Sequence, residues 1–332
     1  MNLNIKKALK IILPLLLGVF LVWYSLSKVS IEAIWGYLQK SNYWWIILGL
    51  FLGLLSHLSR AYRWRFQLEP MGYNIKFGNS VMAVFATYLI NYTIPRAGEV
   101  VRASILANYE EVPFEKGFGT IVAERIADLI VMCGIILLTL FLQFDFIYGF
   151  FAEKFNPIKI VLALVVLALL SIVFFRFIKK SKSKLAIKIK NFINGLIEGA
   201  LSVFKMKKKW AFIFHTLFIW AMYVLMFYVT SLAIEDLEGI SIGAIFIGFI
   251  SASFSIAATN GGIGSYPLAV YAAFSIFGIA QEPSIAFGWI MWASQTLMVV
   301  IFGGLSLIYL PIYNRNKTPI QNSKSQNLTP KT

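Results

Sequence analysis

Six long apolar segments constrain the fold of this sequence more than any other feature. They cover residues 9–27, 43–59, 118–142, 158–178, 210–232 and 284–310. A helix needs about 20 apolar residues to cross the hydrocarbon core of a bilayer. Helices are favoured there because every backbone N–H and C=O must be satisfied within the segment. We therefore expect an all-α polytopic membrane protein with about six full transmembrane helices, and the 59% content of apolar residues fits that class.

Two further apolar regions are interrupted and too short to cross the membrane. Residues 80–95 and 97–109 meet at a Pro-Arg-Ala-Gly break, and residues 240–259 and 266–279 flank Asn-Gly-Gly-Ile-Gly-Ser-Tyr-Pro. Non-helical backbone at membrane depth is tolerated only where it is buried in protein or lines a wet cavity. Each region therefore predicts a broken or re-entrant helical hairpin.

The distribution of Lys and Arg predicts the orientation in the membrane. We place the N-terminus in the cytoplasm and let each interrupted region return to the side it left. The cytoplasmic segments then hold 23 of the 30 basic residues. Four lie outside (Lys28, Lys40, Lys154 and Lys159) and three lie at membrane depth (Arg96, Arg102 and Arg125). Cytoplasmic loops carry an excess of Lys and Arg, so the sequence predicts an inner (plasma) membrane protein with both termini in the cytoplasm.

This topology gives the two broken hairpins opposite orientations, the first entering from the cytoplasm and the second from outside. Opposed broken helices near the midplane are typical of inverted-repeat transporters. We predict that residues 1–311 form a single membrane domain and that residues 312–332 are a polar, disordered cytoplasmic tail. No polar segment is long enough to form a separate soluble domain.

A basic stretch between residues 176 and 209 bears on possible partners. It contains eleven basic residues and one acid, Glu198. In a soluble protein this excess would indicate nucleic acid, but between membrane spans it indicates a cytoplasmic loop. A weakly amphipathic helix over 185–204 could also lie against anionic lipid headgroups. Membrane lipids are therefore the predicted partners, and nucleic acid is not.

Few residues are suited to metal or nucleophilic chemistry. Cys133 is the only cysteine, and His57 and His215 are isolated in apolar segments. The chain has no CxxC or HExxH spacing and no Walker A loop. We therefore expect no cofactor, no metal and no enzymatic activity, and any driving force would come from an ion gradient, the membrane potential or the lipid concentration.

Six charged residues lie at membrane depth, where charge is expensive. They are Arg96, Glu99, Arg102, Glu124, Arg125 and Asp128. Glu124 and Asp128 are four residues apart and share a helix face. Because an unpaired buried charge costs several kcal/mol, the balance of three cations and three anions favours mutual pairing. The charges could serve only to pin the first hairpin, or Arg96 and Arg102 could bind phosphate through their planar forks. A phosphate would then lie between these two arginines and the 97–99 amides, with Gly98 at the break.

The Gly-rich second break can also be interpreted in two ways. Its residues are Asn260, Gly261, Gly262, Gly264 and Tyr266. Gly-rich turns that lead into a helix present free N–H groups to an anion, which would suit a lipid headgroup. Alternatively, the glycines permit a tight turn and close packing.

These motifs resemble the flippase-like family that includes the transmembrane region of lysylphosphatidylglycerol synthetases. That family typically has P-x-x-G-E-x-x-R followed by E-R-x-x-D on the next helix. The matching residues here are Pro95, Gly98, Glu99, Arg102, Glu124, Arg125 and Asp128. Its second motif, P-x-x-P-G-G-x-G followed by an acid, corresponds to 257–264, with both prolines replaced and Pro267 in place of the acid. The resemblance covers about residues 8–311 and implies movement of lipids between leaflets, without lysyl transfer.

Three functions follow as hypotheses. The first is a flippase-like transporter that moves an anionic or glycosylated phospholipid and that could operate with a separate lipid-modifying enzyme. The second is a membrane enzyme that acts on lipid through Glu99, Glu124, Asp128 and a divalent metal. The third is an accessory protein whose embedded charges only hold the fold.

Overall fold

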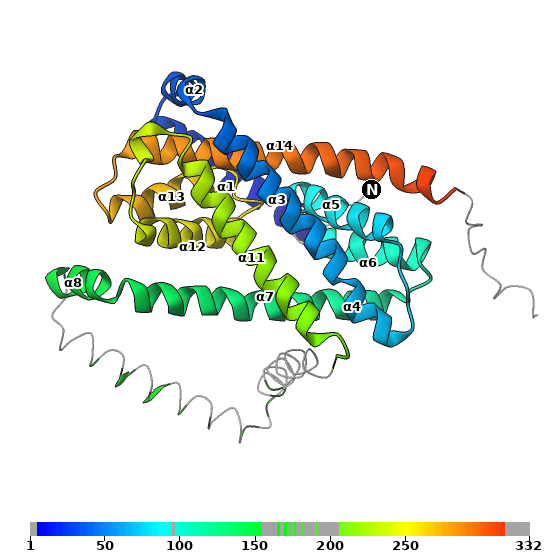
Figure 1. The fold of residues 1–332 in the computed structure, drawn as a ribbon. Coiled ribbons are helices and arrows are strands. Elements are labelled where there is room, and N and C mark those ends of the chain that lie inside the picture. Colours follow the sequence, from blue (N-terminus) through cyan, green and yellow to red (C-terminus); the bar gives the residue numbers. More distant parts are fainter. Residues whose placement is uncertain are drawn as a thin grey trace, which may run out of the picture.

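The protein is a bundle of helices, seen in a computed structural model that describes residues 5–94, 97–154 and 206–315, with scattered residues between 162 and 190. The described part contains helices and turns and no strand, which confirms the all-α class (Figure 1). The helices of the first half are α1 (Ile5–Lys28), α2 (Ile31–Lys40), α3 (Tyr43–Arg63), α4 (Arg65–Leu68), α5 (Phe77–Thr93), α6 (Ala97–Tyr109), α7 (Phe114–Leu142) and α8 (Phe144–Lys154). Those of the second half are α11 (Lys209–Ser231), α12 (Ile242–Ala258), α13 (Ser265–Ser275) and α14 (Gln281–Tyr313), and short 3₁₀ turns cover Glu69–Met71 and Glu235–Leu237.

Four helices are long and apolar enough to cross a membrane: Tyr43–Met71, Phe114–Leu142, Lys209–Ser231 and Gln281–Tyr313. A bent pair, formed by α1 from Leu16 and α2, makes a fifth candidate. These elements match five of the six predicted segments and confirm a polytopic membrane protein. The predicted span at 158–178 and the helix at 185–204 fall largely outside the described residues, as does the tail beyond residue 315.

Both interrupted regions form antiparallel hairpins. In the first, α5 packs against α6, and the Thr87 hydroxyl donates a hydrogen bond to the Gly98 carbonyl at 3.1 Å. In the second, α12 packs against α13, and the Ser251 hydroxyl donates to the Ala269 carbonyl at 2.8 Å. The two hairpins lie toward opposite ends of the bundle, between α14 and α7 (Figure 1).

Contacts with α14 show that the hairpins enter from opposite ends. Near the C-terminal end of α14, the side-chain amides of Asn314 and Asn79 exchange two hydrogen bonds at the base of the first hairpin. Near the middle of α14, Thr296 donates to the Tyr92 hydroxyl at 3.2 Å, close to the tip of that hairpin. One turn away, the Trp292 indole donates to the Gly261 carbonyl at the tip of the second hairpin. The two tips therefore meet near the middle of α14, and the two hairpins have opposite orientations, as predicted.

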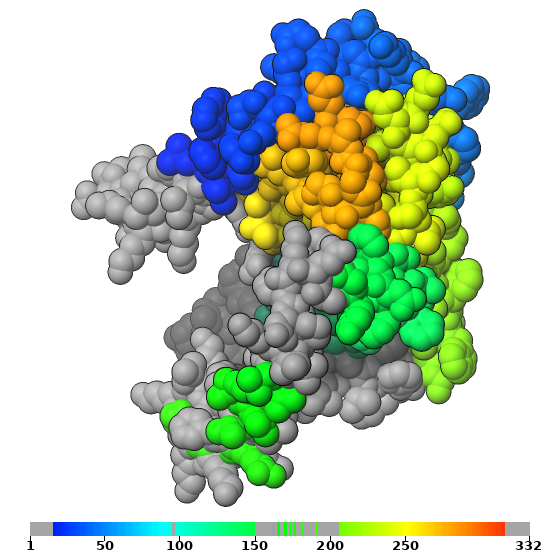
Figure 2. Space-filling view, turned by 90° about the vertical axis from the view of Figure 1, so that its left-hand side faces the viewer, coloured from blue at the N-terminus to red at the C-terminus, as the bar shows by residue number. Residues whose placement is uncertain are grey.

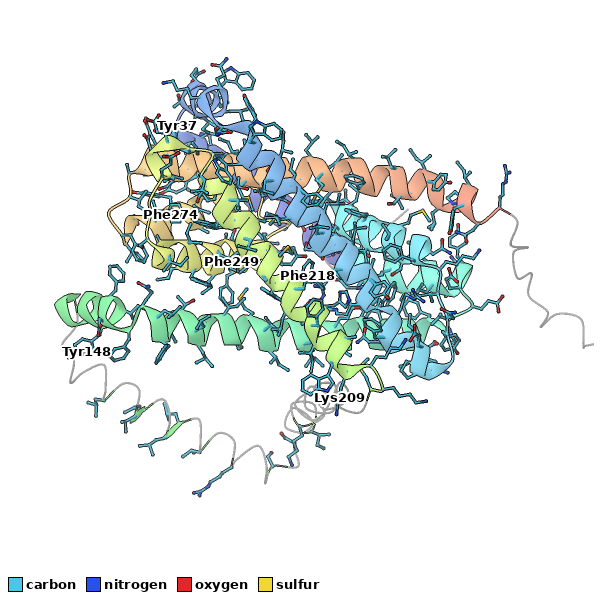
Figure 3. All side chains as sticks on the ribbon, viewed as in Figure 1. Tyr37, Tyr148, Lys209, Phe218, Phe249 and Phe274 are labelled. Atoms are coloured by element: carbon cyan, nitrogen blue, oxygen red, sulfur yellow. The ribbon has the colours of Figure 1, made fainter. Side chains whose placement is uncertain are left out.

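The two ends of the bundle differ in their polar groups. At one end, α2 covers the start of α14 (Figure 2). This helix is bent by 74° from α1, and its Tyr37 donates a hydrogen bond to Asp236. At the other end, α11 begins at Lys209, and Lys208 forms an ion pair with Glu69. Tyr37 and Lys209 mark these opposite ends (Figure 3).

Close helix packing holds the bundle together. The helices α3 and α11 run antiparallel, and Gly49 and Gly53 bring α3 close to Thr230 and Met226 of α11. Small residues let transmembrane helices approach each other closely and so strengthen van der Waals contact. An aromatic core that includes Phe249 and Phe274 fills the side of the bundle that contains the second hairpin (Figure 3).

Candidate functional site: a buried arginine and carboxylate cluster

A buried cluster of charges joins three helices on the side of the first hairpin. Its five central side chains are Arg60 and Arg63 of α3, Arg102 of α6, and Glu124 and Asp128 of α7. None of these residues is more than 6% exposed. Glu124 is the eleventh residue of α7, about 15 Å along the helix from its start. The cluster therefore lies well inside the helix bundle.

Arg102 and Glu124 form the best defined pair. The two terminal nitrogens of Arg102 donate to the two carboxylate oxygens of Glu124 at 2.8 and 3.2 Å. The guanidinium also stacks on the indole of Trp64, 3.8 Å from the ring centroid, and the Trp64 N–H donates to Thr120. A planar fork of this kind matches a carboxylate or a phosphate in a way that a lysine ammonium cannot. The Glu124 carboxylate and the Trp64 ring together therefore fix the orientation of the Arg102 guanidinium.

Asp128 binds the two arginines of α3. Its carboxylate accepts from Arg60 at 2.7 Å and from Arg63 at 3.3 Å. Arg63 also donates to the Thr216 hydroxyl and lies over the ring of Phe212, so that α11 closes this side of the cluster. Arg60 and Arg63 are three residues apart on α3 and therefore share a face toward α7.

The cluster reaches the surface of the described part of the chain at one edge. There Arg125 forms an ion pair with Glu99 at 3.0 Å, and the two side chains are 43% and 20% exposed. Arg125 also lies 3.8 Å from Asp128, which connects this edge to the buried centre. Charge exposed to hydrocarbon is costly, so an exposed pair at this depth is typical of a polar surface rather than a lipid-facing one.

The cluster is richer in donors than in acceptors. Its described members are four arginines and three carboxylates, which leaves a net charge of +1. The Nε groups of Arg60, Arg63 and Arg102 are buried and have no hydrogen-bond partner among the described residues, and one acceptor, Glu99 Oε2, is in the same position. Buried polar groups are nearly always paired. A group that brings negative charge and acceptor oxygens would complement this arrangement.

The tip of the first hairpin is held by its own side chains. The Gly98 N–H donates to the Asn91 side chain at 2.8 Å, and the Ala97 N–H donates to the Ile94 carbonyl at 3.2 Å. Gly98 is required here because a Cβ would collide with the Thr87 carbonyl. Two of the amides expected to hold phosphate are therefore engaged within the hairpin. Arg96, the second predicted ligand, and Pro95 lie outside the described residues.

The glycines of the second break adopt backbone conformations that favour glycine. The φ angles of Gly261, Gly262 and Gly264 are 64°, 79° and 68°. Gly264 lies directly against the backbone of α1 at Leu21 and Val22, and Gly261 lies against the ring of Tyr92. This arrangement supports the packing interpretation of the turn.

The two predicted groups of site residues are only indirectly connected. Asn260 and Tyr266 are buried at the second tip, and Tyr92 connects that tip to the first hairpin. No hydrogen bond or ion pair among the described residues joins Arg102 to the turn at 260–266.

The predicted topology counts Arg60 and Arg63 among the 23 cytoplasmic basic residues. In the structure both lie in the buried cluster. The span predicted at 43–59 stops one residue before Arg60 and four before Arg63, because hydropathy falls where the charges begin. Their spacing of three residues on a continuing helix, matched to the spacing of Glu124 and Asp128, was the available signal. His215, which shares a 2.8 Å hydrogen bond with Ser59, also lies next to this region.

The described residues do not bring together three or more His, Cys, Asp or Glu side chains in a way that could hold a metal ion. The carboxylates of Glu99, Glu124 and Asp128 each face at least one arginine. The arrangement therefore suits recognition of an anion better than coordination of a cation.

Comparison with known proteins places this chain in a family. A family model described as the lysylphosphatidylglycerol synthase TM region matches residues 11–303. A UPF0104 membrane protein of Methanocaldococcus jannaschii is 24% identical, over 84% of this chain and 88% of that protein. A UPF0104 membrane protein of Pyrococcus horikoshii is 27% identical, over 38% of this chain and 37% of that protein.

A third match is shorter. The glycosyltransferase AglD of Haloferax volcanii is 34% identical over 77 residues, which are 23% of this chain and 12% of that protein. The family model, in contrast, spans far more than half of the chain. This protein therefore belongs to the lysylphosphatidylglycerol synthase TM region family.

Proposed function

We propose that the protein moves an anionic or glycosylated phospholipid between the two leaflets of the cell membrane. The observation that carries this proposal is the buried cluster, which has a net charge of +1 and is open at the Arg125 and Glu99 edge. A lipid phosphate supplies the negative charge and the acceptor oxygens that the cluster lacks. The opposed hairpins support the proposal, because transporters bind their substrates where such broken helices meet.

Arg102 would act by exchanging one partner for another. In the observed state its fork is filled by Glu124. A phosphate that enters at the Arg125 edge would compete with Glu124 and Glu99 for guanidinium groups, since Arg forks bind carboxylate and phosphate with similar geometry. The carboxylates would then hold the arginines in place while no lipid is bound. Arg96, with its position at the hairpin tip, stays a predicted phosphate ligand.

The proposal includes the orientation and the partners. With both termini in the cytoplasm, the end of the bundle at Lys208 and Lys209 faces the cytoplasm and the end at Asp236 faces outside, in agreement with the Lys and Arg distribution. No catalytic role is proposed for the chain. A separate lipid-modifying enzyme would supply or consume the transported lipid, as the similarity of one segment to a glycosyltransferase also suggests.

The test is lipid movement in reconstituted vesicles that contain a fluorescent phospholipid. Arg102→Lys keeps the charge but not the fork, so we expect it to slow movement about as much as Arg102→Gln does. Arg65→Lys is the matched control, because Arg65 is partly exposed and pairs with Glu69 outside the cluster. Equal rates for the parent, Arg102→Lys and Arg102→Gln, at equal folded amounts, would exclude a phosphate site at Arg102.

One observation favours the accessory role as a second candidate. Every carboxylate of the cluster is already paired, which is also what a purely structural network requires. The same vesicles separate the two candidates. A folded parent protein that moves none of the phospholipids tested would favour the accessory role.

A further inference from the structure

A second group of buried polar side chains lies between the arginine cluster and the hairpin tips. His57 is 6% exposed and lies one turn before Arg60 on the same face of α3. Its ring is 4.6 Å from that of Tyr88 and 6.1 Å from that of Tyr223, and the two tyrosine hydroxyls are 3.4 Å apart.

The polar side chains continue toward the middle of the membrane. Tyr92 is one turn beyond Tyr88 on α5 and contacts both Thr296 and the second tip. On α14, Gln295 lies against Gly53, which is one turn before His57 on α3. Trp220 packs edge-on against Tyr223, with 6.1 Å between the ring centroids. A polar path therefore runs from the cluster to the point where the tips meet.

This group also contains buried nitrogens without a hydrogen-bond partner. His57 Nδ1, Trp220 Nε1 and Gln295 Nε2 are buried and have no hydrogen-bond partner among the described residues. The Trp and Gln nitrogens can only donate, so each requires an acceptor that the described side chains do not provide. We name His57, Tyr88, Trp220, Tyr223 and Gln295 the aromatic–amide layer, and none of its members is a carboxylate.

We infer that the aromatic–amide layer receives a neutral, hydroxyl-bearing part of the lipid headgroup, such as a glycerol or a sugar. The inference rests on the proposed function and narrows its substrate class. A hydroxyl both donates and accepts, so separate hydroxyls of one headgroup can accept from Trp220 and from Gln295 and can donate to a tyrosine oxygen. The phosphate next to such a hydroxyl would reach the arginine cluster, because His57 and Arg60 are one turn apart.

The same layer disfavours a headgroup that carries an ammonium group. An ammonium donates only, so it would leave Trp220 and Gln295 unpaired and would stand beside Arg60. Cation–π attraction to the rings acts in the opposite sense, but it is worth about 0.5–2 kcal/mol. An uncompensated buried charge costs several kcal/mol, so the repulsive effect is the larger. Phospholipids with a hydroxylated headgroup should therefore be preferred to aminoacylated ones.

The experiment compares three fluorescent lipids in the same vesicles. Phosphatidate carries phosphate alone, phosphatidylglycerol adds hydroxyls, and lysyl-phosphatidylglycerol adds ammonium groups. We expect the parent to move phosphatidylglycerol at least about fivefold faster than either of the others, the effect of about one hydrogen bond. Tyr88→Phe and Gln295→Leu should lower the phosphatidylglycerol rate toward the phosphatidate rate, so that the ratio of the two rates falls.

Controls keep the two proposals distinguishable. Tyr228→Phe changes an exposed tyrosine on the same helix as Tyr223 and should keep the preference of the parent. Equal movement of all three lipids, faster movement of the lysyl lipid, or an intact preference in both Tyr88→Phe and Gln295→Leu would overturn the headgroup inference and leave lipid transport standing. A parent that moves none of the three would overturn both.

Discussion

Removal of the Glu124 carboxylate tests the cluster most directly. Glu124 is 1% exposed and lies within 4.0 Å of three guanidinium groups, those of Arg60, Arg63 and Arg102. Glu124→Gln keeps the size of the side chain but leaves four arginines facing two carboxylates. Breaking a buried pair by removing one partner costs about 3–5 kcal/mol. We expect this variant to lower the free energy of unfolding by that amount.

Removal of the other partner, Arg102, should lower the free energy of unfolding by less. Arg102→Gln removes hydrogen bonds of 2.8 and 3.2 Å, but Glu124 keeps Arg63 at 3.5 Å and Arg60 at 4.0 Å. The cluster becomes neutral, and no carboxylate is left without a cation. The loss is then that of a charged hydrogen bond, about 1.5–3 kcal/mol. The double variant restores the net charge of the parent and should lose less stability than the two single variants added together.

The measurement is thermal unfolding in one detergent, followed by tryptophan fluorescence, for the parent, both single variants and the double variant. Glu69→Gln is the control, because it removes a carboxylate from a surface pair with Lys208 and should change the stability by about 1 kcal/mol or less. The reasoning is refuted if Arg102→Gln destabilises as much as Glu124→Gln, or if the double variant loses the sum of the two.

Two further predictions concern the second hairpin and the orientation. Gly264→Ala should destabilise the protein more than Gly239→Ala, because both positions have φ near 70° but only Gly264 lies against the α1 backbone. Comparable melting temperatures for the two variants would contradict this packing. For the orientation, single cysteines are placed in a Cys133→Ser background. A cysteine at position 238 should be labelled quickly from outside, one at position 263 slowly, and those at 181 or 207 only after the membrane is opened. Fast external labelling at 207 would reverse the assigned topology.

The length of the apolar segments and the residues at their breaks were sufficient to predict the hairpins. Each half-helix is too short to cross the membrane, and each break contains residues that interrupt helices. Two re-entrant hairpins were therefore the simplest prediction. The shared face of Glu124 and Asp128 could likewise be inferred from their spacing, and both carboxylates face arginines of the same cluster in the structure.

The remaining features depended on contacts between distant segments. Sequence alone does not distinguish an arginine that is solvated at the end of a span from one that pairs with a carboxylate on another helix. The sequence therefore predicts Arg60 and Arg63 in the loop. Local sequence also does not show which segment packs against each glycine. Gly264 meets the backbone of α1, a segment more than 240 residues earlier in the chain. Such partners are set by tertiary packing alone.

The meeting of the hairpin tips has a consequence for the response of the protein to voltage. The arginine cluster lies on the Lys208 side of the contact between Tyr92 and Gly261, which is the inner side in the proposed orientation. A phosphate that travels from the cluster past this contact carries its charge across the membrane electric field. That field does about 2.3 kcal/mol of work per elementary charge at 100 mV. With the cell interior negative, the membrane potential would favour export of an anionic headgroup and oppose its import.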